Sequence, residues 1–122
     1  MKDLGIWMDS DHSRLVFLEV SPSEINDAEH ITVQNHHHNP HDKTHHEFHE
    51  YFEAVLKHIP HDVHAFFVFG PSETKVHFEN YMHEKHAHFG PKLLAVETSE
   101  QMTEHQIESH VKHFFEVEAK KI

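Results

Sequence analysis

The sequence predicts an α/β domain built on a mixed five-stranded sheet with helices on its faces. Three observations predict this class. Apolar and β-branched runs crowd the first 34 residues, where successive strands are expected. Residues 65–69 are apolar at every position, as in a central strand covered on both faces. Amphipathic helical patterns alternate with the later apolar runs, which favours parallel strands joined by helical crossovers.

The first three expected strands form a meander. Residues 5–9 are a short apolar run that ends in an acid, and residues 10–13 supply turn chemistry before the apolar run 15–20. Residues 21–23 (Ser-Pro-Ser) end that run. Residues 30–34 then alternate with period two, which indicates a half-buried third strand.

A helix is expected after a polar loop at residues 35–43. Thr44 and Glu47 match the capping box, in which each side chain satisfies the other residue's free backbone N–H group. Apolar residues follow at helical spacing, with Tyr51 on the margin, and Pro60 ends the run. The apolar positions are Phe48, Phe52, Val55, Leu56 and Ile59.

Two further helices and a fifth strand are expected after residues 65–69. Gly70 and Pro71 should start the second helix, because proline suits the first helical position. Residues 93–96 predict the fifth strand, and residues 103–106 form a second capping box before a C-terminal helix. The candidate apolar positions of the two helices are Val76, Phe78, Tyr81, Met82, Ile107, Val111, Phe114 and Phe115.

The resulting order is βββαβαβα. A meander followed by right-handed crossovers builds a mixed sheet of the ribonuclease-H-like kind. We expect residues 1–116 to form one domain and residues 117–122 to be a frayed tail.

Composition limits the classes of function. Twenty-one acidic and ten basic residues give a net charge of −11 with histidine neutral, which argues against a basic nucleic-acid footprint. Nineteen histidines could reverse that balance in mild acid. The chain has no cysteine, no secretory signal pattern and no run of eighteen apolar residues. We therefore expect a cytoplasmic protein that does not span a membrane.

Five short motifs follow one another along nearly the whole chain. They are Gly-Ile-Trp-Met-Asp at 5–9 with His12, the histidine-rich loop before the first helix, Phe-Gly-Pro-Ser-Glu-Thr-Lys at 69–75, Val-Glu-Thr at 96–98 and Met-Thr-Glu-His-Gln at 102–106. In these motifs and their order, the sequence resembles the small bacterial translational machinery proteins. That family resembles the middle domain of archaeo-eukaryotic release factors and of pelota. The turn after Asp9 is longer than in the common pattern, so no role is carried over to Asp9 alone.

The resemblance implies a translation-associated protein that binds the ribosome or RNA. Release factors carry a catalytic Gly-Gly-Gln loop between the third strand and the long helix. Here residues 35–43 fill that position, and the only glycines are Gly5, Gly70 and Gly90. We therefore expect a non-catalytic role without a required cofactor. The candidate binding loop consists of His36, His37, His38, His41 and Lys43.

Two alternatives and one further site stay open. His41, His45 and His49 are spaced to bind zinc or nickel if the helix starts early, although such pairs also arise from composition alone. The histidine count would also suit a pH-responsive adaptor. A helix start at Gly70, with Ser72 and Lys75, is a candidate anion site, but a plain helix start is favoured there.

The sequence contains no complete set of catalytic residues that we can identify. A two-metal nuclease needs converging carboxylates, and Asp9 and Glu47 could supply two, but the fourth strand supplies none. No nucleophile elbow is present. The C-terminal helix carries a polar face that we expect to be solvated. Its members are Glu104, His105, Glu108, His110 and His113.

Overall fold

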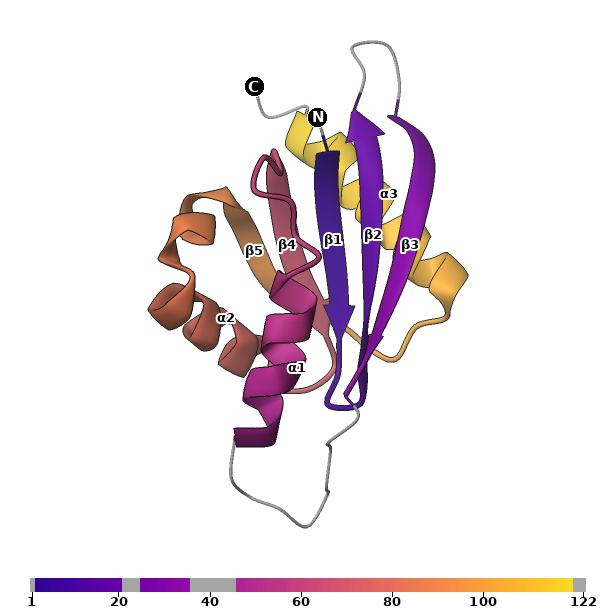
Figure 1. The fold of residues 1–122 in the computed structure, drawn as a ribbon. Helices are drawn as coiled ribbons and strands as arrows, with labels where there is room; N and C mark the ends of the chain where they lie inside the picture. Colours follow the sequence, from indigo (N-terminus) through magenta and orange to yellow (C-terminus); the bar gives the residue numbers. More distant parts are fainter. Residues whose placement is uncertain (1, 21–24, 36–45, 120–122) are drawn as a thin grey trace.

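A mixed five-stranded sheet lies at the centre of the computed structural model, which describes residues 2–20, 25–35 and 46–119 (Figure 1). The first half of the chain supplies β1 (Lys2–Met8), β2 (His12–Val20), β3 (Ile25–Gln34) and α1 (His46–Leu56). The second half supplies β4 (Ala65–Gly70), α2 (Thr74–Lys85), the 3-10 helix η1 (Ala87–Lys92), β5 (Leu93–Thr98) and α3 (Glu104–Ala119).

The strand order is β3-β2-β1-β4-β5. The β1–β2 and β2–β3 pairs are antiparallel, and the β1–β4 and β4–β5 pairs are parallel. This arrangement confirms the predicted α/β class with its mixed sheet. The first three strands are longer than expected, because the ladder extends past the residues whose apolar pattern is visible. The short helix η1 was not predicted.

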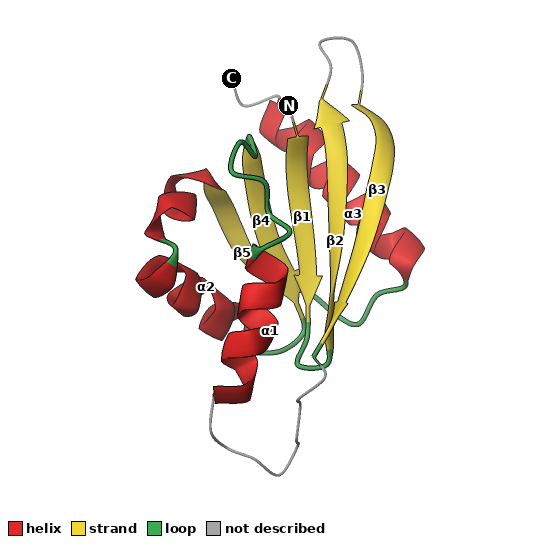
Figure 2. Cartoon of the chain, in the orientation of Figure 1, coloured by secondary structure: helices red, strands yellow, loops and turns green. Residues whose placement is uncertain are grey.

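The helices form two layers around the sheet. Helices α1 and α2 cover one face, and α3 crosses the other (Figure 2). Strand β4 serves both layers, because Phe66 and Val68 belong to the α1–α2 core while Phe67 and Phe69 belong to the α3 core. All six residues of β4 are buried, which confirms the prediction of a central strand.

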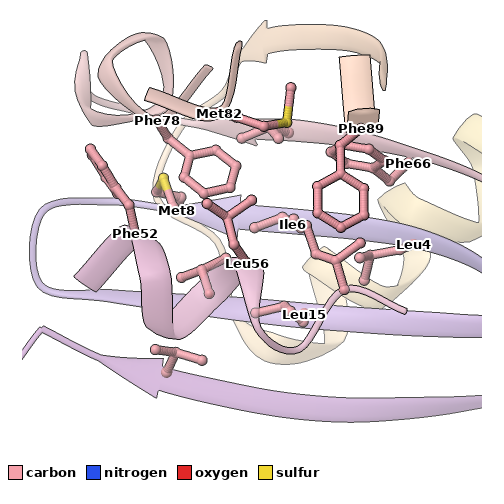
Figure 3. Packing of buried hydrophobic residues seen from close by; sticks show 14 of the residues in the cluster. Leu4, Ile6, Met8, Leu15, Phe52, Leu56, Phe66, Phe78, Met82 and Phe89 are labelled. Carbon is pink, nitrogen blue, oxygen red and sulfur yellow. The ribbon is translucent and has the colours of Figure 1, made fainter. Parts of the chain in front are cut away.

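The larger core lies under α1 and α2 (Figure 3). Leu4, Ile6 and Met8 alternate along β1 toward these helices, as a strand period of two requires. Phe52 and Phe78 meet edge to face between the two helices, with ring centroids 5.4 Å apart. This packing fixes α1 and α2 against the sheet.

Helix α2 begins later than predicted. It starts at Thr74, and Glu73 is its N-cap, so Pro71 lies outside the helix. The Gly70 carbonyl still takes part in the sheet, because it accepts a hydrogen bond from Ser99 N at 3.0 Å. Residues 71–73 then turn the chain away from β4 before the helix begins. Val76, a predicted core position, is 42% exposed. With the later start, the buried side of α2 passes through Thr74, Lys75, Phe78 and Met82.

Helix α3 begins with the predicted capping box. Thr103 N donates to Gln106 Oε1 at 2.9 Å, and Gln106 N donates to Thr103 Oγ1 at 3.2 Å. The helix continues to Ala119, beyond the residue at which we expected the tail to begin. Thr44 of the first expected capping box lies outside the described residues. Within the described chain, none of the helices is both long enough and apolar enough to cross a bilayer.

Candidate functional site

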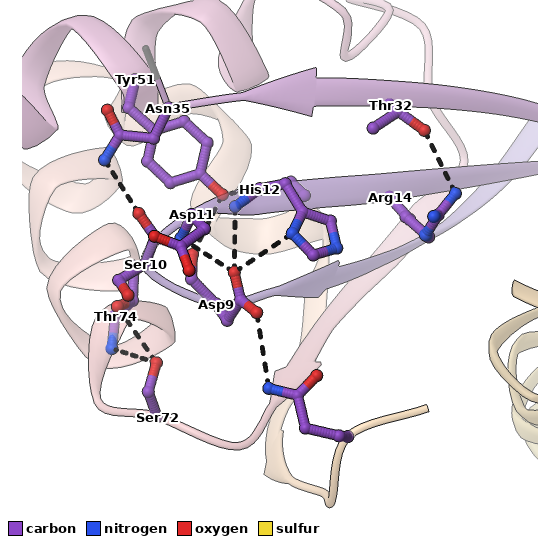
Figure 4. A network of polar contacts seen from close by, with 12 residues as sticks. Asp9, Ser10, Asp11, His12, Arg14, Thr32, Asn35, Tyr51, Ser72 and Thr74 are labelled. Carbon is purple, nitrogen blue, oxygen red and sulfur yellow. Dashed lines mark hydrogen bonds and ion pairs between the residues drawn. The ribbon is translucent and has the colours of Figure 1, made fainter. Parts of the chain in front are cut away.

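Polar residues collect at one edge of the sheet, where parallel strands end. The carboxyl ends of β1, β4 and β5 share this edge, which is where open α/β sheets commonly bind ligands. The β1–β2 turn lies there too, and the chain returns to it after β3, because Asn35 N donates to the Asp11 carbonyl at 2.8 Å. The edge therefore brings together residues that are distant in sequence (Figure 4).

Asp9 organises the β1–β2 turn. Its carboxylate Oδ1 accepts hydrogen bonds from Asp11 N at 2.8 Å and His12 N at 2.9 Å (Figure 4). This is the local bonding by which aspartate stabilises turns. His12 Nδ1 lies 3.5 Å from the same oxygen, and Gln101 Nε2 donates to Oδ2 at 3.5 Å. Asp9 is only 8% exposed, so its carboxylate is committed to holding the turn.

Tyr51 links α1 to this turn. Its hydroxyl donates to the Asp9 carbonyl at 3.0 Å and is hydrogen-bonded to the Ser13 hydroxyl. The sequence placed Tyr51 on the margin of α1, yet it is 2% exposed. Burial raises the pKa of Tyr51 well above its ordinary value, so the hydroxyl stays protonated and keeps its donor role. The position of α1 is thereby fixed relative to the β1–β2 turn.

The β4–α2 junction contributes the residues of the predicted anion site. A Cβ atom at Gly70 would lie 2.0 Å from the Met8 carbonyl oxygen, so only glycine allows β4 to pass β1 there. The Ser72 hydroxyl donates to Thr74 Oγ1 at 3.1 Å. Lys75 is 6% exposed, and its ammonium donates to the Ser72 carbonyl at 2.6 Å. The structure brings Gly70, Ser72 and Lys75 together in a closed turn.

The histidine segment before α1 is only partly described. His36, His37, His38, His41, Lys43 and His45 lie outside the described residues. His49 is exposed, and its ring lies 5.0 Å from that of Tyr81. Among the described residues, no three histidine, aspartate or glutamate side chains are grouped to hold a metal ion.

The polar face of α3 is less solvated than the sequence suggested. His30 on β3 lies between Glu104 and Glu108, with its Nδ1 3.5 Å from Glu104 and its Nε2 2.6 Å from Glu108. His110 packs against Phe69 with ring centroids 4.8 Å apart and pairs with Glu97 at 3.3 Å. Helical spacing alone could not reveal these contacts, since the partners lie on distant strands.

Further polar groups at the sheet were missed because nothing in their local sequence marks them. The Trp7 indole Nε1 and Asn35 Oδ1 are buried without a hydrogen-bond partner among the described residues. Asn35 Nδ2 donates to the Ser10 carbonyl at 2.9 Å. Asn35 directly follows β3, where the polar loop was expected to begin, but its side chain is buried.

Comparison with known proteins reveals a similarity of fold to solved structures. No protein-family model matches the sequence, and a search of curated proteins finds no match. Among solved structures, Archaeoglobus fulgidus Pelota is similar with a TM-score of 0.59 and 14% identity, over 98% of this chain and 37% of Pelota. S. cerevisiae Dom34, a translation termination-like factor involved in RNA quality control pathways, matches with a TM-score of 0.46 and 8% identity, over 98% of this chain and 38% of Dom34.

The fold is therefore an α/β domain similar to a part of Pelota. The chain spans a little over a third of the length of Pelota, so the likeness concerns one part of that protein.

Proposed function

We propose that this chain is a non-catalytic, translation-associated protein of the translational machinery family, which binds the ribosome or RNA in the cytoplasm. The observation that supports the proposal is the Pelota-like fold, which extends over 98% of the chain at a TM-score of 0.59. The strand and helix order also matches the release-factor middle domain that the sequence motifs resemble. The proposal concerns binding because the Gly-Gly-Gln motif of release factors is absent from the sequence.

The proposed contact segment is the histidine-rich stretch with His36, His37, His38, His41 and Lys43. Both of its flanks are held at the same edge of the sheet. On one side, Asn35 donates to the carbonyls of Asp11 and Ser10. On the other, Tyr51 in the second turn of α1 donates to the Asp9 carbonyl. An edge that fixes both ends of a segment is a rigid support for a binding loop.

The charge of the chain restricts how this segment would bind. A net charge of −11 opposes contact with phosphates over most of the surface. Histidines and Lys43 concentrate the groups that can carry positive charge in one segment. In this segment, contact with RNA phosphates would therefore depend on the histidines and Lys43, because the chain as a whole is acidic.

Sedimentation tests the proposal. Tag-free protein in a native lysate is run on a sucrose gradient at low salt, and we expect it in ribosomal fractions. Replacement of His36, His37, His38 and His41 by Asn and of Lys43 by Gln should move the protein to the top of the gradient. A matched variant with His105→Asn and His113→Asn, two exposed histidines on α3, should sediment like the parent protein. Absence of the parent protein from every ribosomal fraction, across growth phases, contradicts the proposal.

A further inference from the structure

A cavity lies beside the amino ends of β1 and β4, at the edge of the sheet opposite to the one that holds Asp9. It measures about 340 Å³ and is enclosed by the end of α1, the residues that follow it and η1. His64 N donates to the Lys2 carbonyl at 2.8 Å, which places residues 61–64 at the start of β1. This cavity is therefore separate from the edge that holds Asp9 and the flanks of the histidine segment.

Flat rings dominate one side of this cavity. The ring of His61 is nearly parallel to those of His88 and Phe89, at angles of 25° and 16° and centroid distances of 5.8 Å and 6.3 Å. Phe89 is buried edge to face against Phe66, as Figure 3 shows, while His61 and His88 are exposed. The cavity thus combines a fixed apolar ring with two imidazoles that solvent can reach.

Hydrogen bonds hold the two segments that carry these rings. The Lys92 ammonium donates to the His61 carbonyl at 2.8 Å, which ties the loop after α1 to the end of η1. Phe89 N donates to the His86 carbonyl at 3.1 Å. The two segments that carry the rings are therefore joined to one another before any ligand arrives.

The polar side of the cavity has a hydrogen-bonded carboxylate and an ammonium group without a paired carboxylate. Glu53 Oε1 accepts hydrogen bonds from the Tyr81 hydroxyl at 2.6 Å and from His86 Nε2 at 2.8 Å. Lys57 also lines the cavity, one turn further along the chain, and no carboxylate within the described ranges pairs with its ammonium. A positive charge is therefore available on this side of the cavity, although the chain as a whole has a net charge of −11.

We propose that this cavity binds the base of an unpaired RNA nucleotide, stacked on the exposed rings of His61 and His88 beside the buried Phe89, with its phosphate near Lys57. Histidine and phenylalanine rings are common stacking surfaces for unpaired bases, because every base has a flat face. The positive charge of Lys57 favours an anionic ligand. It disfavours a guanidinium or ammonium group, which can also lie over the face of an aromatic ring. This inference rests on the RNA-binding form of the proposed function and adds to it a second contact site, outside the histidine segment.

The direct test uses oligoadenylate RNA, AMP and an abasic strand of equal length as probes, with imidazole and amide NMR shifts as the readout. We expect oligoadenylate to shift the signals of His61, His88 and Phe89, and the abasic strand to leave them unchanged. The double variant His61→Ala, His88→Ala should bind oligoadenylate about five- to 150-fold more weakly, the range measured for loss of base stacking. Lys57→Gln should weaken binding and reduce its salt dependence.

The control variant is His105→Ala with His113→Ala, which also removes two exposed histidines and should bind like the parent protein. Amide spectra of each variant check that the fold is intact. Equal binding of the abasic strand, or unchanged binding by the His61, His88 variant, overturns the inference. If AMP binds as tightly as oligoadenylate, the ligand is a free nucleotide rather than RNA, and the inference is overturned.

Sedimentation separates this inference from the proposed function. A parent protein that enters ribosomal fractions but does not bind oligoadenylate overturns the cavity inference and leaves the ribosome association standing. A parent protein that binds oligoadenylate at this cavity, yet stays out of every ribosomal fraction, supports the inference and overturns the ribosome association alone.

Discussion

The imidazole Nε2 of His30 lies 2.6 Å from the carboxylate Oε1 of Glu108, which joins strand β3 to helix α3. Strand β3 is an edge strand with only β2 beside it in the sheet, and this contact attaches it to the helix on the α3 face. Arg14 on β2 extends the same contact zone, with its guanidinium 3.6 Å from Glu104. Polar and charged side chains thus attach the antiparallel half of the sheet to the helix on its face.

The first prediction concerns acid stability. Hydrogen bonding to His30 is the main cause that holds the pKa of Glu108 below its ordinary value of 4.5. A carboxyl whose pKa is lower in the folded protein stabilises it above the unfolded pKa and loses that effect as the pH falls through the folded pKa. Glu108→Gln should therefore reduce the free energy of unfolding at pH 6, and the difference from the parent protein should shrink below about pH 4.5.

Urea unfolding across that pH range measures this difference. Glu116→Gln, at an exposed position on the same helix, is the matched control and should unfold like the parent protein at each pH. A deficit of the Glu108 variant that is the same at pH 6 and at pH 3 would show that the carboxylate charge is not what matters.

The second prediction concerns the Tyr51 hydroxyl. Tyr51→Phe leaves the Asp9 carbonyl and the Ser13 hydroxyl without a buried partner, which should cost about 1–3 kcal/mol of the free energy of unfolding. A double-mutant cycle with Ser13→Ala should show non-additive losses, since the two side chains contact each other. Urea unfolding at neutral pH supplies the four values. Strictly additive losses would mean that the two hydroxyls do not interact.

The sequence allowed the strand and helix order to be predicted because each element carries a local pattern. The unbroken apolar run at residues 65–69 indicated a central strand, and Thr103 with Gln106 marked the start of α3. The exact start of α2 was wrong by about one turn. The position of Pro71 favours a helix start, but the path of the chain out of β4 decides where the helix can begin.

The candidate sites were harder to predict because their partners are distant in sequence. Tyr51 is separated from Asp9 by 42 residues, and His30 from Glu108 by 78. His61 and His88 looked like any other exposed histidines in a chain that has nineteen. Only the packing of the segment after α1 against η1 brings their rings to one cavity.

The third prediction concerns close packing between β1 and α3. A Cβ atom at Gly5 would lie 2.3 Å and 2.8 Å from the two Cγ atoms of Val111. Gly5→Ala should therefore force α3 away from the sheet and cost about 1–3 kcal/mol, as overpacked cores do. Adding Val111→Ala should recover part of the loss. Thermal unfolding measures both effects.

Gly90→Ala is the control for that prediction, since its nearest contacts are ring atoms of His83 at 3.3 Å, at the exposed end of a side chain that can move. We expect a smaller loss there than at Gly5. A Gly5 variant as stable as the Gly90 variant would mean that α3 is not held closely against β1.

The fourth prediction concerns metal binding by the histidine segment, where His41, His45 and His49 are the proposed zinc or nickel ligands. His45 and His49 are four residues apart in sequence, a spacing that places two imidazoles on one face of a helix. If these residues form a site, titration of tag-free protein with zinc should show stoichiometric, sub-micromolar binding by calorimetry. His45→Ala with His49→Ala should abolish it, because two of three ligands are lost.

The double variant His105→Ala, His113→Ala should retain that binding, since both residues lie on α3, on the other face of the sheet from α1. Binding should also weaken in mild acid, because zinc and protons compete for the same imidazole nitrogens. Weak binding that never saturates, or equal loss in both double variants, would show that histidine content alone attracts the metal and that residues 41–49 do not form a site.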